Sequence, residues 1–290
     1  MIRIAPWLQT NWDWRAAGNF ICGGTGAGVL IFAAIAPVPG SAYRLLATIG
    51  MAFVATGLFC VWLEIGRPFR AINVFRQPQM SWMSRESLVA PLLFASGIAA
   101  TWLGGGALGW IAAVFAAAFL YCQARMLRAA KGIPTWRAPR IVPLMLFTGL
   151  AEGTGLMLML AAFPSGNAPS GWLQGILIVL VVARGLAWHF YRVQLEGNGV
   201  PSRAFDVLRA IHTPMSVLGL WGPLLLLLIA SSFAAATWIA AIAGLCALGS
   251  GWLLKFTVIT RAAYNQGFAV PRLPVRGAGG PGPAVKPGWH

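Results

Sequence analysis

Residues 63–88 read LEIGRPFRAINVFRQPQMSWMSRESL and lie between two long apolar stretches of the chain. This short polar segment holds two of the six acidic residues in the sequence, Glu64 and Glu86. Four arginines and a tryptophan accompany them: Arg67, Arg70, Arg76, Arg85 and Trp82. The flanking apolar stretches are long enough for membrane helices, so the segment is predicted to be a loop between two transmembrane helices.

The composition extends this interpretation to the whole chain. Of its 290 residues, 58% are hydrophobic and 9% are charged, whereas soluble domains carry about 25% charged residues. We therefore predict an all-α integral membrane protein. Eight runs are predicted to cross the bilayer: 16–38, 43–64, 86–104, 107–128, 140–163, 171–192, 209–231 and 234–257. Residues 1–15 carry three tryptophans and are expected at the membrane interface.

The basic residues are distributed very unevenly between the predicted loops. An even number of spans places both termini on one side of the membrane, and that side then holds 19 of the 21 Lys and Arg residues. Arg44 alone lies on the other side. Because positively charged loops stay in the cytoplasm, both termini and the 63–88 loop are predicted to be cytoplasmic. The net charge of +15 is thus a topology signal, and we do not interpret it as nucleic-acid binding.

The two halves of the sequence resemble each other in their polar loops. RAINVFR at 70–76 matches RAFDVLR at 203–209, and Gly-Thr-Gly occurs at 24–26 and at 153–155. We predict two parallel four-helix repeats followed by a flexible tail rich in Gly and Pro. The corresponding ranges are 1–135, 136–276 and 277–290. Chance similarity between apolar helices is the alternative.

The positions of the cysteines and histidines limit which cofactors the chain could carry. The four cysteines lie singly within apolar runs, whereas iron–sulfur clusters need grouped thiolates. We expect no iron–sulfur cluster and no other metal site in this chain. His189 and His212 flank one connection and are the candidate ligands for a b-type haem. One haem between them is the alternative to the prediction that the chain carries none.

Glu86 begins the third predicted span and is the strongest candidate for chemistry. A quinol releases two protons when it is oxidised, and a carboxylate at the interface can accept them and exchange them with water. We predict a quinone-binding site formed by Glu86, Arg85, Trp82, Glu64 and Asn19. The alternative for Glu86 is stabilisation of a helix start, with Ser84 as N-cap. The alternative for Glu64 is an ion pair with Arg67.

Two ionisable residues are predicted deep within the spans, Glu152 in the fifth and Arg184 in the sixth. Ionisable groups at such depth are energetically costly and are usually paired. Neighbouring antiparallel helices would allow Glu152 and Arg184 to pair. The sequence leaves two interpretations of this pair open, a structural ion pair and part of a proton path.

The polar loop resembles a motif of the membrane-anchor subunits of the dimethyl sulfoxide reductase type, within the wider NrfD-like group. In that family one span ends in His-Leu-Gly-x-Pro, and the next begins with Ser-x-x-Ser-x-Glu. Here the matching segments are Glu64–Pro68 and Ser81–Glu86. The family histidine is replaced by Glu64, which puts the transfer of its role in doubt. The eight spans and the length also agree with the family.

The resemblance implies a multi-pass subunit of a respiratory complex in the bacterial inner membrane. It implies a site for ubiquinone or menaquinone that involves Glu86, and no haem. It also implies two partners on the cytoplasmic face, an iron–sulfur subunit with four clusters and a molybdopterin catalytic subunit. The reaction of the complex would occur on the catalytic partner, and no catalytic residue is expected in this chain. Five arginines are predicted to dock the partner: Arg67, Arg70, Arg76, Arg137 and Arg140.

The N-terminal sequence NWDWRAAGNFICGGTGAG, residues 11–28, also resembles the anchors of phenylacetyl-CoA:acceptor oxidoreductases, which belong to the same group. A cytoplasmic docking face agrees with a cytoplasmic substrate such as an acyl-CoA or sulfite. Two other classes remain open. They are a secondary transporter and a purely structural anchor, both in contact with membrane lipid and neither with quinone chemistry.

Overall fold

A computed structural model describes residues 4–36, 38–65, 68–162, 170–232, 237–270, 272, 280 and 282–289. Within these residues, eight helical segments are long and apolar enough to cross a membrane. The first four are α1 (Trp14–Ile35), α2 (Gly40–Glu64), α3 (Trp82–Leu103) and α4 (Ala107–Ala129). The predicted all-α fold and the count of eight spans are therefore confirmed.

The second half supplies the other four spans. The fifth and sixth are α6 (Ile141–Ala161) and α7 (Ser170–Asn198). The seventh combines α9 (His212–Ser216), the π-helical turn η2 (Val217–Trp221) and α10 (Gly222–Ser232). The eighth combines α11 (Thr237–Phe256) with the π-helical turn η3 (Thr257–Arg261). Three short elements lie in the loops: η1 (Pro68–Arg76), α5 (Pro134–Arg137) and α8 (Ser202–Ala210).

The start of α3 differs from the prediction. Ser81 is the N-cap, and its side chain accepts a hydrogen bond from the Ser84 amide at 3.3 Å. A serine in this position satisfies a backbone donor that the first turn leaves free. The helix therefore begins at Trp82, and the predicted cap at Ser84 is wrong. Glu86 consequently lies more than one turn inside the helix, where its side chain can be buried.

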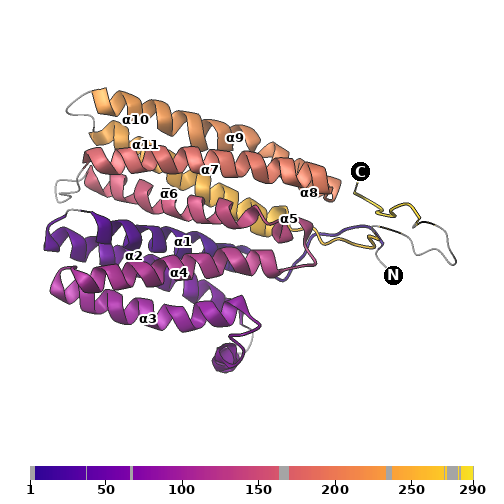
Figure 1. The fold of residues 1–290 in the computed structure, drawn as a ribbon, viewed down its shortest axis with the longest axis horizontal. Helices are drawn as coiled ribbons and strands as arrows, with labels where there is room; N and C mark the ends of the chain where they lie inside the picture. Colours follow the sequence, from indigo (N-terminus) through magenta and orange to yellow (C-terminus); the bar gives the residue numbers. More distant parts are fainter. Residues whose placement is uncertain are drawn as a thin grey trace.

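Helix α1 lies at the centre of the bundle. It contacts α2 and α4 of the first half and α6 and α11 of the second (Figure 1). The contact with α6 depends on glycine, because a Cβ added at Gly28 would meet the carbonyl oxygen of Gly149, and one added at Gly153 would meet the Gly28 backbone. Small residues at these positions allow the two backbones to approach closely.

Figure 1 shows α1–α4 as one layer and α6–α11 as a second layer stacked on it. The boundary between the layers falls where the sequence predicts the boundary between the two repeats. A relation between the repeats by duplication stays a prediction.

The two ends of the chain meet at one end of the bundle (Figure 1). The Gln9 amide donates to the Ala263 carbonyl at 3.0 Å, and the Phe268 amide donates to the Ile4 carbonyl at 2.8 Å. Farther along, the indole of Trp289 donates to the Gln266 carbonyl at 3.1 Å and is almost completely buried. Within the predicted flexible tail, residues 282–289 are thus held against the preceding chain.

Candidate functional site

Three helices bring a buried polar cluster together at Glu86. The carboxylate of Glu86 in α3 is 3% exposed, and Asn19 of α1 donates its side-chain amide to it at 3.4 Å. Gln123 of α4 lies beside the same carboxylate and donates to the Asn19 backbone carbonyl at 3.0 Å. Glu86 and Asn19 are therefore close together, as the sequence predicted. Gln123 was not predicted, although it is an uncharged polar residue within an otherwise apolar run.

This cluster contains unused hydrogen-bond acceptors. The side-chain oxygens of Asn19 and Gln123 are buried and have no partner among the described residues. Buried polar atoms are nearly always hydrogen-bonded, so such atoms call for a partner beyond the chain itself. A hydroxyl donor would satisfy either oxygen, and the Glu86 carboxylate beside them can also accept a proton.

Arg85 does not lie beside Glu86 in the way that the sequence predicted. Its guanidinium turns back to the loop and donates to the carbonyls of Pro78 at 2.7 Å and Gln79 at 2.9 Å. The reason is geometric, because adjacent residues on a helix point in directions about 100° apart. Arg85 therefore fixes the loop before α3.

Trp82 lies in a separate aromatic and cationic cluster at the same end of α3. The guanidinium carbons of Arg85 and Arg125 lie 4.1 Å and 4.5 Å from its ring centroid. Tyr121 meets the ring edge-on at 5.7 Å and accepts a hydrogen bond from Arg125 at 2.7 Å. Arg125 and Tyr121 come from α4 and were not predicted. The cluster joins the start of α3 to the end of α4. Trp82 lies about one helical turn from Glu86, and Tyr121 and Arg125 each lie two residues from Gln123.

Glu64 ends α2 and has no contact with Glu86 in the part of the chain that the structure describes. The charges that act on it are Asp13 and Arg15 at the start of α1. Arg15 pairs with Asp13 at 2.8 Å and also donates to the Leu63 carbonyl at 2.8 Å. The hydrogen bond from Arg15 lowers the pKa of Asp13 below its usual value. Arg67, the alternative partner of Glu64, lies outside the described residues.

The prediction that Glu152 pairs with Arg184 is wrong, because Glu152 pairs with a different cation. Glu152 of α6 is completely buried, and Lys255 of α11 forms the ion pair with it at 2.5 Å. Thr25 of α1 donates to the same carboxylate oxygen at 2.9 Å and accepts from the Trp252 indole at 3.1 Å. Lys255 lies near the end of the predicted span 234–257 and was counted with the basic residues of the cytoplasmic side. The eighth span instead continues through η3 to Arg261, so Lys255 is enclosed within the bundle.

Arg184 finds backbone partners instead. Its guanidinium donates to the carbonyls of Ala247 at 2.7 Å and Gly219 at 2.5 Å and to the Ser250 hydroxyl at 3.1 Å. Gly219 lies in the π-helical turn of the seventh span, and such turns disturb the regular pattern of backbone hydrogen bonds. The cation is thus buried without a direct carboxylate partner among the described residues, although it remains close enough to Glu152 to interact electrostatically.

Helix α1 connects the two buried clusters, from two sides that lie about 120° apart around its axis. Asn19 belongs to the Glu86 cluster and Thr25 to the Glu152 cluster. The two residues are six positions apart, which is about 9 Å along the axis. Cys22 lies between them and is near enough to Lys255 and Glu152 to feel their charges.

Four of the five arginines predicted for docking lie at the end of the bundle where the termini meet, and the fifth, Arg67, is outside the described residues. Arg137 donates to the Lys131 carbonyl and to the Gln266 side chain. Arg76 ends η1 and is exposed. Arg70 also belongs to η1. Arg140 precedes α6 and is exposed.

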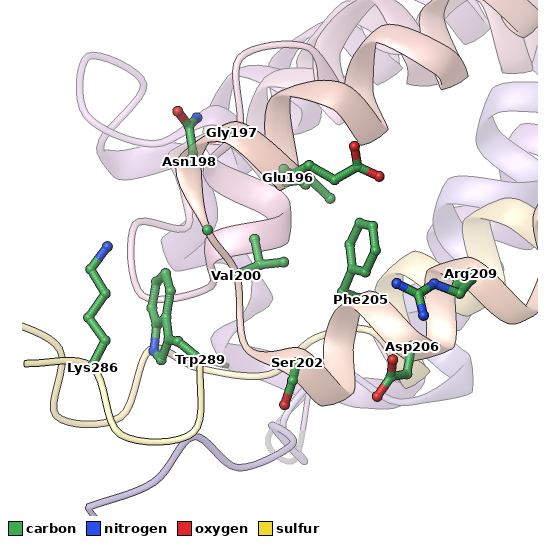
Figure 2. Close-up of a pocket in the computed structure, with 12 residues that line it drawn as sticks. Glu196, Gly197, Asn198, Val200, Ser202, Phe205, Asp206, Arg209, Lys286 and Trp289 are labelled. Atoms are coloured by element: carbon green, nitrogen blue, oxygen red, sulfur yellow. The ribbon is translucent and has the colours of Figure 1, made fainter.

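Two cavities lie at this end of the molecule. A cavity of about 500 Å³ is lined by Arg128, Lys131 and Arg137, with no acidic residue among those that line it. A second cavity of about 540 Å³, shown in Figure 2, is lined by both charges, including Glu196, Asp206 and Arg209. Positive charge is therefore concentrated on the side of α5 rather than spread evenly over this end.

The two histidines lie on α7 and at the start of α9, near enough for the charge of His189 to act on His212. His212 accepts a hydrogen bond from the Trp188 indole at 3.3 Å through its Nδ1 atom. A group of three metal-binding side chains is absent from the described residues. This geometry assigns His212 a structural hydrogen bond.

Comparison with known proteins adds one relative. The chain is similar to a sulfite dehydrogenase subunit from Allochromatium vinosum. The two are 28% identical over 165 residues, which cover 50% of each protein. The chain thus matches about half the length of this curated relative. No family model matches the chain.

Proposed function

We propose that this chain is the membrane anchor and quinone-reactive subunit of a molybdoenzyme-type oxidoreductase complex. Electrons would pass between a membrane quinone and a docked iron–sulfur subunit. The observation that carries the proposal is the buried cluster of Asn19, Glu86 and Gln123 in three membrane helices. The relative, which is named as a subunit of a sulfite dehydrogenase, supports a role in an oxidoreductase complex.

The chemistry of the cluster suits a quinone headgroup. Bound ubiquinone or menaquinone would supply two-electron chemistry coupled to two protons. The free oxygens of Asn19 and Gln123 can accept hydrogen bonds from hydroxyl groups and orient them. The Glu86 carboxylate can take one proton and pass it on, whereas the two amides cannot hold a proton at neutral pH. The aromatic ring of Trp82, one turn away, would form a wall of the entrance.

The partner would dock on the end where the termini meet, which we propose to be cytoplasmic. Exposed cations gather there, among them Arg76 and Arg137, and Arg70 belongs to the same short helix as Arg76. Complementary charge would orient an acidic surface of the iron–sulfur subunit, which in turn would contact the molybdopterin subunit. The relative's name supports sulfite as the substrate class of the partner and gives no support for phenylacetyl-CoA.

The deciding experiment is purification of the native complex from membranes with a tag on this chain. We expect an iron–sulfur protein with four cluster motifs to copurify and the complex to exchange electrons with a soluble quinone analogue. A complex that contains the iron–sulfur protein but does not react with quinone would identify a purely structural anchor. A chain that purifies alone and does not react with quinone would contradict the proposal altogether.

A secondary transporter is the second candidate, favoured by the completely buried pair of Glu152 and Lys255. Ionisable groups in the interior of a bundle often line the path of an ion or proton. Uptake of a substrate into vesicles that contain only this chain would support transport. Proton movement that occurs only during quinone turnover would instead make Glu152 and Lys255 part of a proton path in the redox complex.

A further inference from the structure

A groove opens on the outer surface of the second layer, between α6 and α7. Its volume is about 430 Å³, and apolar side chains from both helices line it, among them Phe147, Ala183 and Leu186. Arg140 lines the end of the groove that lies at the start of α6, on the side of the chain termini. The groove therefore joins a cation at the end of a span to an apolar wall within the span.

The groove faces the lipid rather than another part of the chain. Large apolar side chains are exposed along one side of α7 at helical spacing: Val179, Val182, Leu186, Phe190 and Val193. In a protein with eight membrane helices, such a stripe contacts acyl chains. Leu186 and Phe190 belong both to this stripe and to the groove wall, so an acyl chain can enter the groove from the side.

Arg140, the cation at the α6 end of the groove, is held in position and can still bind a ligand. Arg140 donates from Nη1 to the Phe190 carbonyl at 2.8 Å, and its guanidinium carbon lies 5.1 Å from the Phe190 ring centroid. Among the described residues it has no ion pair. A guanidinium has five N–H donors, so several remain for a ligand. The N-terminus of α6 lies at the same place and adds partial positive charge.

We propose that this groove binds a phospholipid with an anionic headgroup, from the leaflet on the side of the termini. The phosphate would contact Arg140, and one acyl chain would lie against Phe147, Ala183 and Leu186. Charge complementarity selects this occupant, because a groove without an acidic residue in its wall carries a guanidinium without an ion pair among the described residues, at the start of a membrane span. This site is separate from the Glu86 cluster, and the inference does not depend on the proposed quinone function.

The test is lipid binding to the purified full-length chain, together with any subunits that accompany it. The protein is placed in equal amounts of phosphatidylglycerol and phosphatidylcholine, and the bound lipids are identified by native mass spectrometry. We expect wild-type protein to retain phosphatidylglycerol preferentially and Arg140→Gln to lose about fivefold of that preference, the equivalent of one cation near a membrane surface.

Arg209→Gln is the matched control. Arg209 also lies over a phenylalanine, Phe205, at 5.2 Å and at the same end of the molecule. Its cavity contains Glu196 and Asp206, so an anionic lipid should not prefer it. If Arg209→Gln and Arg140→Gln lose the lipid preference equally, the preference reflects the overall positive charge of the protein rather than this groove. That result would overturn the proposal.

A second variant tests the apolar part without changing charge. Ala183→Phe should fill the groove, and its partly exposed position lets the fold accommodate the larger side chain. We expect this variant to release the retained phosphatidylglycerol. Retention equal to wild type, a quinone as the bound molecule, or a second copy of the chain in place of the lipid would each contradict the proposal.

Discussion

Glu86 can be tested by the exchange of one oxygen for a nitrogen. Glu86→Gln preserves the shape of the side chain but removes its ability to accept a proton at neutral pH. We expect quinone-linked electron transfer in the purified complex to fall at least about 100-fold, because general acid–base groups typically contribute that much. Binding of a quinone analogue should also weaken. Steady-state assays with a soluble quinol and a titration of the analogue provide the measurements.

Glu196→Gln is the control for this substitution. Glu196 is half exposed and pairs with Arg192 at 3.8 Å, far from the Glu86 cluster in the chain and on a different helix. We expect its electron transfer to match wild type. Wild-type activity in Glu86→Gln would remove the carboxylate from the proposed site.

The Glu152–Lys255 pair predicts that the effects of substituting the two residues on stability are strongly coupled. Removal of one partner leaves an uncompensated charge within the bundle, so Glu152→Gln or Lys255→Met should each destabilise the protein by about 3–5 kcal/mol. The double variant should recover much of that loss, because neither charge then remains unpaired. Thermal unfolding in detergent measures all three. Additive losses in the double variant would mean that the two residues do not act as a pair.

At the scale of elements, the approach of α1 to α6 depends on the absence of side chains. Gly153→Ala would direct a Cβ into the Gly28 backbone, so the two helices must separate. We expect a loss of about 1–3 kcal/mol in stability, as for other overpacked cores. Gly249→Ala on α11 is the control, since a Cβ there meets nothing within 4 Å, and the helix should become slightly more stable. A stable Gly153→Ala variant would show that the two helices can separate at little cost.

The spans could be predicted from the sequence because length and hydropathy are local properties. The partner of Glu152 could not, because both α7 and α11 pack against α6. The choice between them depends on how α6 is rotated about its axis, and a helix that is apolar on all sides gives no sign of that rotation. Lys255 was counted with the basic residues at the end of its span, and not as a buried partner, for a related reason. The π-helical turn after Phe256 extends the eighth span, and the hydropathy pattern does not reveal it.

The site shows the same division between local and non-local information. Glu86 was identified because a carboxylate beside an apolar run is rare in this chain. Arg85 was assigned to the site through its neighbour in sequence, although the helix turns it towards the loop. Gln123 was missed because an amide in α4 becomes significant only when α1 and α3 bring Asn19 and Glu86 to it.

At the scale of the whole molecule, the even number of spans and the contact between the two termini predict that both termini lie on the same side of the membrane. We expect both termini in the cytoplasm, because the side that carries them also holds most of the basic residues. Fusions of alkaline phosphatase to either end should be inactive, and fusions of green fluorescent protein should fluoresce. An active phosphatase fusion at one end alone would contradict the even number of membrane crossings.

The contact between the two ends of the chain also has a consequence for biosynthesis. The segment around Ile4 and Gln9 leaves the ribosome first, but its hydrogen-bond partners, Ala263 and Phe268, follow the last span. The surface that these segments form together therefore cannot exist until all eight spans have been synthesised. A chain that stops before residue 263 would leave its own beginning unpaired. The same contact would thus make synthesis through Phe268 a requirement for assembly with any partner that recognises this end.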